Sequence, residues 1–444
     1  MEEENRQLQA ESLQGASLQE ESLQPQINTE QVHTKEKKRG ILRALLFGIL
    51  IGLVISQIVI LVMIRVVGLT GIGRLAVLNG EITKKKGTVL TKDVQNKVKL
   101  IESSIAQNYL YDVTDEQLAD GIYEGLLEAT GDRYADYYTK EDMQKLQETT
   151  SGVFYGIGAY VGLDQATGYP KLTGIMEGTP AEKAGLKAED IIVEVDGKDV
   201  RGYELSDAVA LIKGEEGTKV LLTIYREGQT EYMKIEVTRA RVESPTVTYE
   251  KKEDGIAYIR IMQFEAVTSM QFAEKLQQAR DEGMKGLILD LRSNPGGTLD
   301  SVVKIARMIL PEGMIVYTED KYGKRNEFKC NGENAFDLPL VVLINENSAS
   351  AAEILSGAIK DYKLGTLVGK TTYGKGIVQK VFYMTDDTAL KLTISHYYTP
   401  NGNDIHEVGI EPDVDVDLDV EKYLDEDVDT QYDEALKQLK KKMQ

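Results

Sequence analysis

The sequence predicts a multidomain α/β protein with a single N-terminal transmembrane helix. Three observations support this prediction. An uncharged run of 21 residues lies near the N-terminus, a stretch with helical spacing follows it, and strand and helix patterns alternate over residues 245–420. The chain has 444 residues, of which 42% are hydrophobic. A chain of this length can form roughly two to four domains.

The composition limits the kinds of partner that the protein can bind. It has 52 basic and 72 acidic residues, and the resulting net charge of −20 repels the phosphate backbone of nucleic acids. Cys330 is the single cysteine, which excludes an intramolecular disulfide. We interpret it as an incidental loop cysteine rather than a reactive thiol. The His-Glu-x-x-His motif of zinc proteases is absent, and we expect neither a metal nor a cofactor.

Ala44–Ile64 is predicted to cross the cell membrane. At about 1.5 Å per residue, a helix of this length spans a hydrocarbon core of about 30 Å. A signal peptide has a shorter apolar core, and no good cleavage site follows this run. Five basic residues lie in the flank before it, whereas Arg65 is the nearest base after it. The positive-inside rule then predicts a disordered cytoplasmic tail over 1–43, a membrane helix over 44–65 and an extracytoplasmic remainder.

Residues 91–150 are predicted to form a helical arm. Apolar residues recur at helical spacing, for example at Val98, Ile101 and Ile105. The arm has no pattern of reactive residues, so we interpret it as a packing or dimerisation element. A homodimer could form through this arm and through the C-terminal helical segment, residues 421–444, in which 430–444 is predicted to be a short amphipathic helix.

Residues 151–240 have short strands separated by turns. Within Gly178-Thr-Pro-Ala-Glu-Lys-Ala-Gly-Leu186, Thr179 and Glu182 are expected to form the capping box of a short helix. Ile191–Val195 is expected to be a strand that ends in a tight Asp-Gly turn. This pattern resembles a PDZ domain of the bacterial-protease type over the whole of residues 151–240.

The resemblance to PDZ domains implies a peptide-binding site. In such domains a glycine-rich loop binds the terminal carboxylate of a peptide, which adds as a strand beside the second helix. The alternative is that the glycines of this loop are only turn glycines. The residues that the resemblance assigns to peptide binding are Tyr155, Gly156, Ile157, Gly158, Val209 and Ile212.

Residues 245–420 are predicted to form an α/β core that carries a reactive serine. Ser350 follows an apolar strand, 338–344, and precedes a helix, 351–362. A nucleophile there would place a developing oxyanion beside free backbone N–H groups and the positive end of a helix dipole. Ser350 and Glu353 also fit an ordinary capping box, and this segment alone favours the capping role.

Two further segments favour a catalytic role for Ser350 over the capping role. Lys375 and Gln379 are four residues apart, and in a strand they would point to one face. A lysine in an apolar pocket has a lowered pKa and can act as a general base, with Gln379 orienting its amine. The turn Leu291–Gly297 can bring a backbone N–H of Gly296 or Gly297 close to a carbonyl group, although it also fits ordinary turn chemistry.

Together these segments resemble the C-terminal processing peptidases, also called tail-specific proteases. The features that this chain has in common with the family are a PDZ domain, the Leu-Arg-x-Asn-x-Gly-Gly turn, the Asn-x-x-Ala-Ser-Ala-x-Glu-Ile segment and the Gly-Lys-Gly-x-x-Gln segment. The spacing also agrees, because Lys375 lies 25 positions after Ser350. The resemblance implies a crotonase-like protease core and a serine endopeptidase that recognises free C-terminal tails of proteins. It assigns Ser350 as nucleophile, Lys375 as general base, Gln379 as its orienter, and the N–H groups of Gly296 or Gly297 and Ala351 as oxyanion hole.

Two other classes of protein stay open. The chain could be a PDZ adaptor with an inactive protease domain, but the intact Ser350, Lys375 and Gln379 argue against this. It could also be a crotonase-type acyl-CoA enzyme, which the PDZ resemblance and the expected external location disfavour. A Ser-His-Asp triad would need His396 or His406, and neither lies in a motif of its own.

Overall fold

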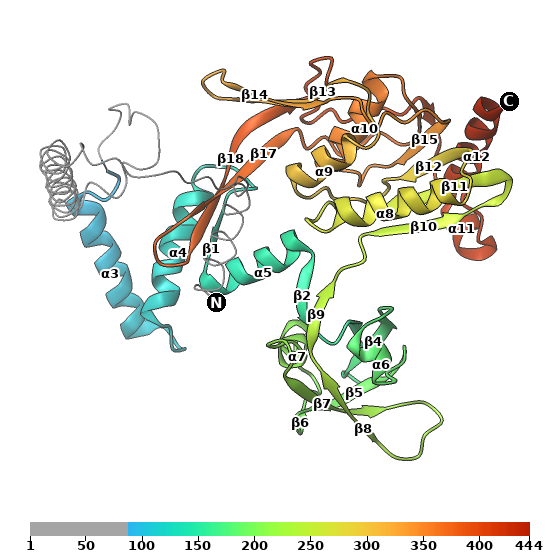
Figure 1. Cartoon of the computed structure of the whole chain (residues 1–444). Coiled ribbons are helices and arrows are strands. Elements are labelled where there is room, and N and C mark those ends of the chain that lie inside the picture. Colours follow the sequence, from blue (N-terminus) through green and yellow to red (C-terminus); the bar gives the residue numbers. More distant parts are fainter. Residues whose placement is uncertain (1–87) are drawn as a thin grey trace, which may run out of the picture. The chain divides into compact units, whose positions relative to one another are not determined.

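The structure, a computed structural model, describes residues 88–444 (Figure 1). The predicted tail (1–43) and membrane helix (44–65) lie outside the described residues. Between residue 88 and residue 444, no helix has the length and apolar character needed to span a bilayer. The chain divides into two compact units, 1–103 and 104–444, and the boundary falls within helix α3 (Lys92–Asn108). The elements below belong to the second unit.

A six-stranded sheet forms the centre of the core. Its order is β10 (Val247–Lys251), β11 (Ile256–Ile261), β12 (Gly286–Asp290), β15 (Leu340–Ile344), β16 (Thr366–Gly369) and β19 (Val414–Asp415). All neighbouring strands are parallel except the pair β10 and β11. Strands of a parallel sheet are buried on both faces, which is why β12 and β15 are almost entirely apolar in sequence.

Helices cover both faces of this sheet (Figure 1). One face packs against α8 (Thr268–Asp281), α9 (Leu299–Ala306) and α10 (Ala351–Asp361). The other face packs against α12 (Thr430–Met443), whose Ala435 and Leu439 lie in a cluster with Ile288 and Val341. The segment 421–444 is therefore not one continuous helix, although its second helix coincides with the amphipathic helix predicted over 430–444. It contains a short helix, α11 (Val420–Glu426), and then α12, which is a layer of the core.

A second, antiparallel sheet shows that the arm is not wholly helical as predicted. Between α4 (Asp115–Glu128) and α5 (Lys140–Ser151) lies a short strand, β1 (Asp136–Tyr138). It pairs with the core strand β18, with Tyr137 opposite Leu390 (Figure 1). The remaining strands are β13 (Gly313–Asp320), β14 (Arg325–Cys330), β17 (Ile377–Tyr383) and β18 (Ala389–Tyr398). The arm thus contributes a strand to the same sheet as β17, the strand that begins just after Lys375.

The region 151–240 has its own sheet and its own apolar core. The main order is β3 (Ala159–Leu163), β4 (Pro170–Ile175), β5 (Ile191–Val195), β7 (Lys219–Tyr225) and β8 (Met233–Thr238), with β6 (Lys198–Asp199) beside β5. Two helices, α6 (Pro180–Lys183) and α7 (Leu205–Ile212), accompany the sheet. The chain enters and leaves through a ribbon of β2 (Val153–Gly156) and β9 (Ala240–Glu243). Because β3 is an edge strand, its outer side can pair with another strand.

Candidate active site

Ser350 lies at the sharp turn between β15 and α10 and is the N-cap of α10. Its backbone has φ 54° and ψ −113°, a conformation that costs about 1–3 kcal/mol in a residue with a side chain. The surrounding hydrogen bonds hold it there. The Ser350 N–H donates to Glu353 Oε2 at 2.7 Å, and the Tyr397 hydroxyl donates to the Ser350 carbonyl at 3.0 Å. The next N–H, that of Ala351, begins the helix and has no acceptor within it.

Glu353 has a larger role than the capping box that the sequence indicates. Its side chain is fully buried, and its carboxylate accepts four hydrogen bonds. The donors are Ser350 N at 2.7 Å, Thr372 Oγ1 at 2.6 Å, Gly374 N at 2.7 Å and Lys375 N at 2.9 Å. A buried carboxylate is stable only when such donors surround it. Glu353 therefore fixes the backbone of the serine turn to that of the lysine loop.

Lys375 lies in the loop before β17, outside the strand in which it was predicted. Its side chain is partly buried, and its Nζ is 4.5 Å from the centre of the Tyr134 ring. Burial lowers the pKa of Lys375, and the positive charges of Lys391 and Arg133 lower it further, whereas Glu353 and Asp132 raise it. The net direction is downward, which favours the neutral amine that a general base requires.

Gln379 is not joined to Lys375 by a hydrogen bond in the part of the chain that the structure describes. Its Nε2 donates instead to Thr393 Oγ1 on β18, at 3.3 Å. The prediction assumed that alternating strand residues point to one face. This assumption fails because Lys375 precedes the strand and because the β17–β18 register shifts between Val378 and Gln379.

The glycine turn after β12 lies directly against Ser350. A Cβ atom on Gly296 would be 2.7 Å from the Ser350 Cβ, and one on Gly297 would be 2.2 Å from the Phe264 carbonyl oxygen. The Gly296 N–H already donates to Asn294 Oδ1 at 2.8 Å. The Gly297 N–H donates to no group within residues 88–444, and this residue is exposed. Of the two predicted donors, Gly297 therefore has the free N–H.

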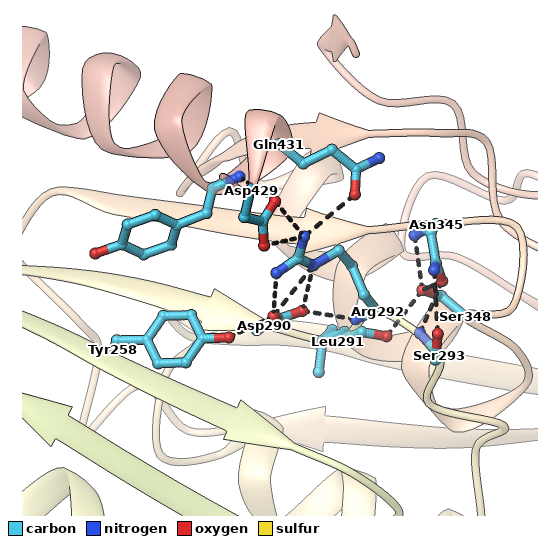
Figure 2. A network of polar contacts seen from close by, with 10 residues as sticks. Tyr258, Asp290, Leu291, Arg292, Ser293, Asn345, Ser348, Asp429 and Gln431 are labelled. Carbon is cyan, nitrogen blue, oxygen red and sulfur yellow. Dashed lines mark hydrogen bonds and ion pairs between the residues drawn. The ribbon is translucent and has the colours of Figure 1, made fainter. Parts of the chain in front are cut away.

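Arg292 connects this glycine turn to α12 (Figure 2). Its guanidinium donates to the buried Asp290 and, through Nη1, to Asp429 Oδ1 at 2.9 Å and Gln431 Oε1 at 3.2 Å. The Tyr258 hydroxyl also donates to Asp290, at 2.6 Å. The sequence alone does not reveal this network, because its members come from three separate segments of the chain.

Ser293 and Asn345 join the glycine turn to the serine turn in the same region (Figure 2). The Ser293 N–H donates to Asn345 Oδ1 at 2.7 Å, and the Ser348 hydroxyl donates to the Leu291 carbonyl at 2.8 Å. The segments that carry Gly297 and Ser350 are thus fixed to each other by several hydrogen bonds. This arrangement can support acyl transfer, because acyl transfer needs a nucleophile and oxyanion donors in fixed positions.

The two histidines considered for a triad lie together. Their ring centroids are 5.3 Å apart, and His396 Nδ1 is 3.6 Å from Asp404 Oδ2. Neither His396 nor His406 forms a hydrogen bond to Ser350 within the described residues. The geometry therefore gives no support to a Ser-His-Asp triad.

A groove of about 260 Å³ lies between β3 and α7 in the 151–240 region. Five of the six residues predicted to bind a peptide line it: Gly156, Ile157, Gly158, Val209 and Ile212. Tyr155 does not line the groove, whereas its neighbour Phe154 does. The reason is the alternation of the strand β2, which directs successive side chains to opposite sides.

The loop at the end of this groove is held in place by hydrogen bonds to its carbonyl group at Gly158. The Gly158 carbonyl accepts hydrogen bonds from Met176 N at 3.1 Å and from Thr179 Oγ1 at 3.0 Å. The prediction of a Thr179–Glu182 capping box was wrong, because the Thr179 hydroxyl donates to carbonyl groups and does not cap α6. The N–H groups of Ile157 and Gly158 donate to no group in residues 88–444 and are available to a ligand.

The fold and the site define a serine peptidase with a PDZ domain. Residues 255–416 match Peptidase family S41, and residues 172–226 match the PDZ domain family. The chain belongs to the carboxyl-terminal processing proteases.

Two curated relatives show this membership, and one similar solved structure is described after them. The Carboxyl-terminal-processing protease of Synechocystis sp. is 38% identical over 302 residues, covering 67% of this chain and 71% of the relative. The Carboxy-terminal processing protease CtpA of Bacillus subtilis is 35% identical over 353 residues, covering 79% and 75%. The structure of the photosystem II D1 C-terminal processing protease is 31% identical and covers 73% of this chain and 88% of that chain, with a TM-score of 0.43.

Proposed function

We propose that this protein is a membrane-anchored serine endopeptidase in which Ser350 is the nucleophile and Lys375 the general base. One observation carries the proposal. The carboxylate of Glu353 binds the backbone of both residues, while burial and nearby cations favour the neutral amine of Lys375. Without this link, a lysine in a glycine loop and a serine at a helix N-cap would be unremarkable.

The proposed reaction has two halves. The neutral Lys375 amine accepts the proton of the Ser350 hydroxyl as Oγ bonds to the scissile carbonyl carbon. The N–H groups of Ala351 and Gly297 stabilise the resulting oxyanion, and the Lys375 ammonium then gives its proton to the leaving amine. Water, deprotonated by the neutral lysine, attacks the acyl ester in the second half, and the serine recovers its proton. Gln379 would act on Lys375 only indirectly, because its side chain donates to Thr393 on β18.

We further propose that the PDZ domain binds the free C-terminus of the substrate. A peptide would pair with the open edge of β3, its carboxylate on the N–H groups of Ile157 and Gly158 and its last side chain in the groove. Lys213 lines the same groove and adds a positive charge, which is shared with Glu148 of α5 in this structure. Main-chain pairing makes such recognition loose, with a preference for small or apolar last residues. Binding would shift the enzyme towards its active population.

The location and the oligomeric state are also proposals. The apolar run 44–64 with its basic flank supports a single-pass protein with an extracytoplasmic protease domain. External protease added to spheroplasts should then digest the C-terminal domain and leave the N-terminal tail intact. Exposed apolar side chains on α4 and α11, such as Leu126 and Leu424, support a homodimer through the arm and the C-terminal segment.

The decisive experiment compares the full-length protein with its Ser350→Ala and Lys375→Ala variants. The substrate is an unstructured protein that ends in Val-Ala, that ends in Asp-Asp, or that ends in an amidated Val-Ala. We expect both variants to lose activity by orders of magnitude and the free Val-Ala end to be cleaved fastest. If Ser350→Ala cleaves at the parent rate, the chain is not a protease of this mechanism. If the three ends are cleaved equally, the tail-binding proposal fails.

A further inference from the structure

The arm of the protein contacts the side chain of Lys375 directly. Its loop 129–135 connects α4 to β1, and the Tyr134 ring lies against the amine, with its centre 4.5 Å from Nζ. Arg133 lies against the same ring, with 4.8 Å from Cζ to the centroid, and donates to the Tyr134 hydroxyl at 2.6 Å. The Arg133 Cζ is also 5.9 Å from the ring of Tyr373, two residues before Lys375.

This loop is fixed to the protease core. Asp132 Oδ1 accepts from the Tyr134 N–H at 2.9 Å, and Asp132 Oδ2 accepts from the Thr393 N–H at 3.3 Å. Beyond the loop, β1 pairs with β18, and the Lys391 amine donates to the Tyr138 hydroxyl at 2.6 Å. Strand β18 also pairs with β17, which follows directly after Lys375. The arm therefore forms one wall around the lysine.

Charged groups from three elements act on the Lys375 amine. Arg133 from the arm loop and Lys391 from β18 disfavour its protonated form, whereas Glu353 from α10 and Asp132 from the arm loop favour it. The Tyr134 ring covers one side of the amine and attracts its protonated form through the π system. The direction in which each charged group acts on Lys375 is therefore known, and each charge can be removed by a single substitution.

We propose that the arm is part of the active site and that Arg133 is a positioning residue, which acts through Lys375 by favouring the neutral form of its amine. The inference rests on the proposed role of Lys375 as general base. It gives the arm a catalytic purpose beyond packing or dimerisation. A protein that lost the arm loop would retain Ser350 and Lys375 but would need a higher pH to work.

The test measures the titration of the Lys375 amine without using activity. In the full-length protein with Ser350→Ala, the amines are acetylated briefly at a series of pH values, and mass spectrometry gives the labelling of Lys375. Arg133→Gln should move the titration of Lys375 to higher pH by about 0.2–0.7 unit, as expected of one exposed charge. Asp132→Asn should move it to lower pH. Arg133→Lys should restore the parent midpoint, and the effect of Arg133→Gln should shrink in high salt.

Arg280→Gln is the matched control, because Arg280 is an exposed arginine on α8 in the same unit, and it should leave the titration unchanged. An unchanged midpoint in Arg133→Gln, or shifts of the same sign in Arg133→Gln and Asp132→Asn, would overturn the proposal. The proposed function is judged separately by the activity of Lys375→Ala. In the otherwise unmodified enzyme, the acidic limb of kcat/KM should follow the labelling shifts in direction and size.

Discussion

The backbone N–H groups of Ser350 and Lys375 donate to the same oxygen atom, Oε2 of Glu353, at 2.7 and 2.9 Å. One buried carboxylate oxygen therefore sets the separation of the proposed nucleophile and base at the level of the main chain. The side chains can still rotate, but the two turns that carry them cannot drift apart without breaking charge-assisted hydrogen bonds.

Glu353→Gln should reduce kcat/KM by at least about 100-fold and the free energy of unfolding by about 2–5 kcal/mol. The amide of glutamine directs two N–H donors at groups that are themselves donors, and it removes the charge that stabilises them. Activity and urea unfolding measure the two effects. Glu346→Gln is the control, since Glu346 is exposed in the same turn, and it should change neither. Parent activity in Glu353→Gln would contradict the role given to this carboxylate.

Asp429→Asn should lower kcat more than it raises KM. Arg292 would lose a charged partner in α12, and the glycine turn that follows it would become less well held. The expected loss of stability is about 1.5–3 kcal/mol, as for a hydrogen bond to a charged group. Steady-state kinetics and urea unfolding provide the measurement. Asp433→Asn, an exposed position in the first turn of the same helix, should behave like the parent.

Glu265→Gln should make the protein more stable above neutral pH. Burial raises the pKa of Glu265 to about 7, and its Oε2 has no hydrogen-bond partner among the described residues. The folded state therefore favours the protonated acid, and this contribution, complete below the unfolded pKa of about 4.3, is lost as the pH rises through 7. Urea unfolding at pH 5 and pH 8 should show that Glu265→Gln removes a difference of about 1–3 kcal/mol. Glu274→Gln, exposed on α8, should retain the parent pH dependence; equal slopes for both variants would refute the assignment.

Lys213→Gln should raise KM for substrates with a free C-terminus and leave kcat nearly unchanged. The variant removes the positive charge from the PDZ groove, so a terminal carboxylate loses part of its attraction. Amidated substrates should be affected much less, because they carry no such charge. Lys234→Gln, on the exposed face of β8, is the control. Equal increases in KM for free and amidated ends would mean that Lys213 does not sense the carboxylate.

The sequence was informative where one segment contains all the necessary signals. The apolar runs of β12 and β15 and the serine at the strand–helix junction are local features, and the structure contains them at the expected positions. The strand β1 was missed because its partner β18 is more than 250 residues away. The role of Glu353 was also missed, since three of its donors come from the loop 372–375.

Other differences arise from single side chains or single backbone irregularities. The choice between Gly296 and Gly297 depends on the Asn294 side chain, which occupies one of the two N–H groups. The position of Gln379 relative to Lys375 depends on a register shift between β17 and β18, and no residue type in the sequence indicates this shift. Such features are decided by tertiary contacts, and period-2 reasoning along a strand cannot reveal them.

The network of Arg292 has a consequence for protein synthesis. Arg292 leaves the ribosome 137 residues before Asp429, its partner in α12. During translation its guanidinium can bind Asp290, which lies two residues earlier, but the support for the glycine turn from the far side of the sheet does not yet exist. The proposed oxyanion donors therefore gain this support only after residue 431 has emerged. A nascent copy that already contains Ser350 and Lys375 therefore still lacks this support for the glycine turn.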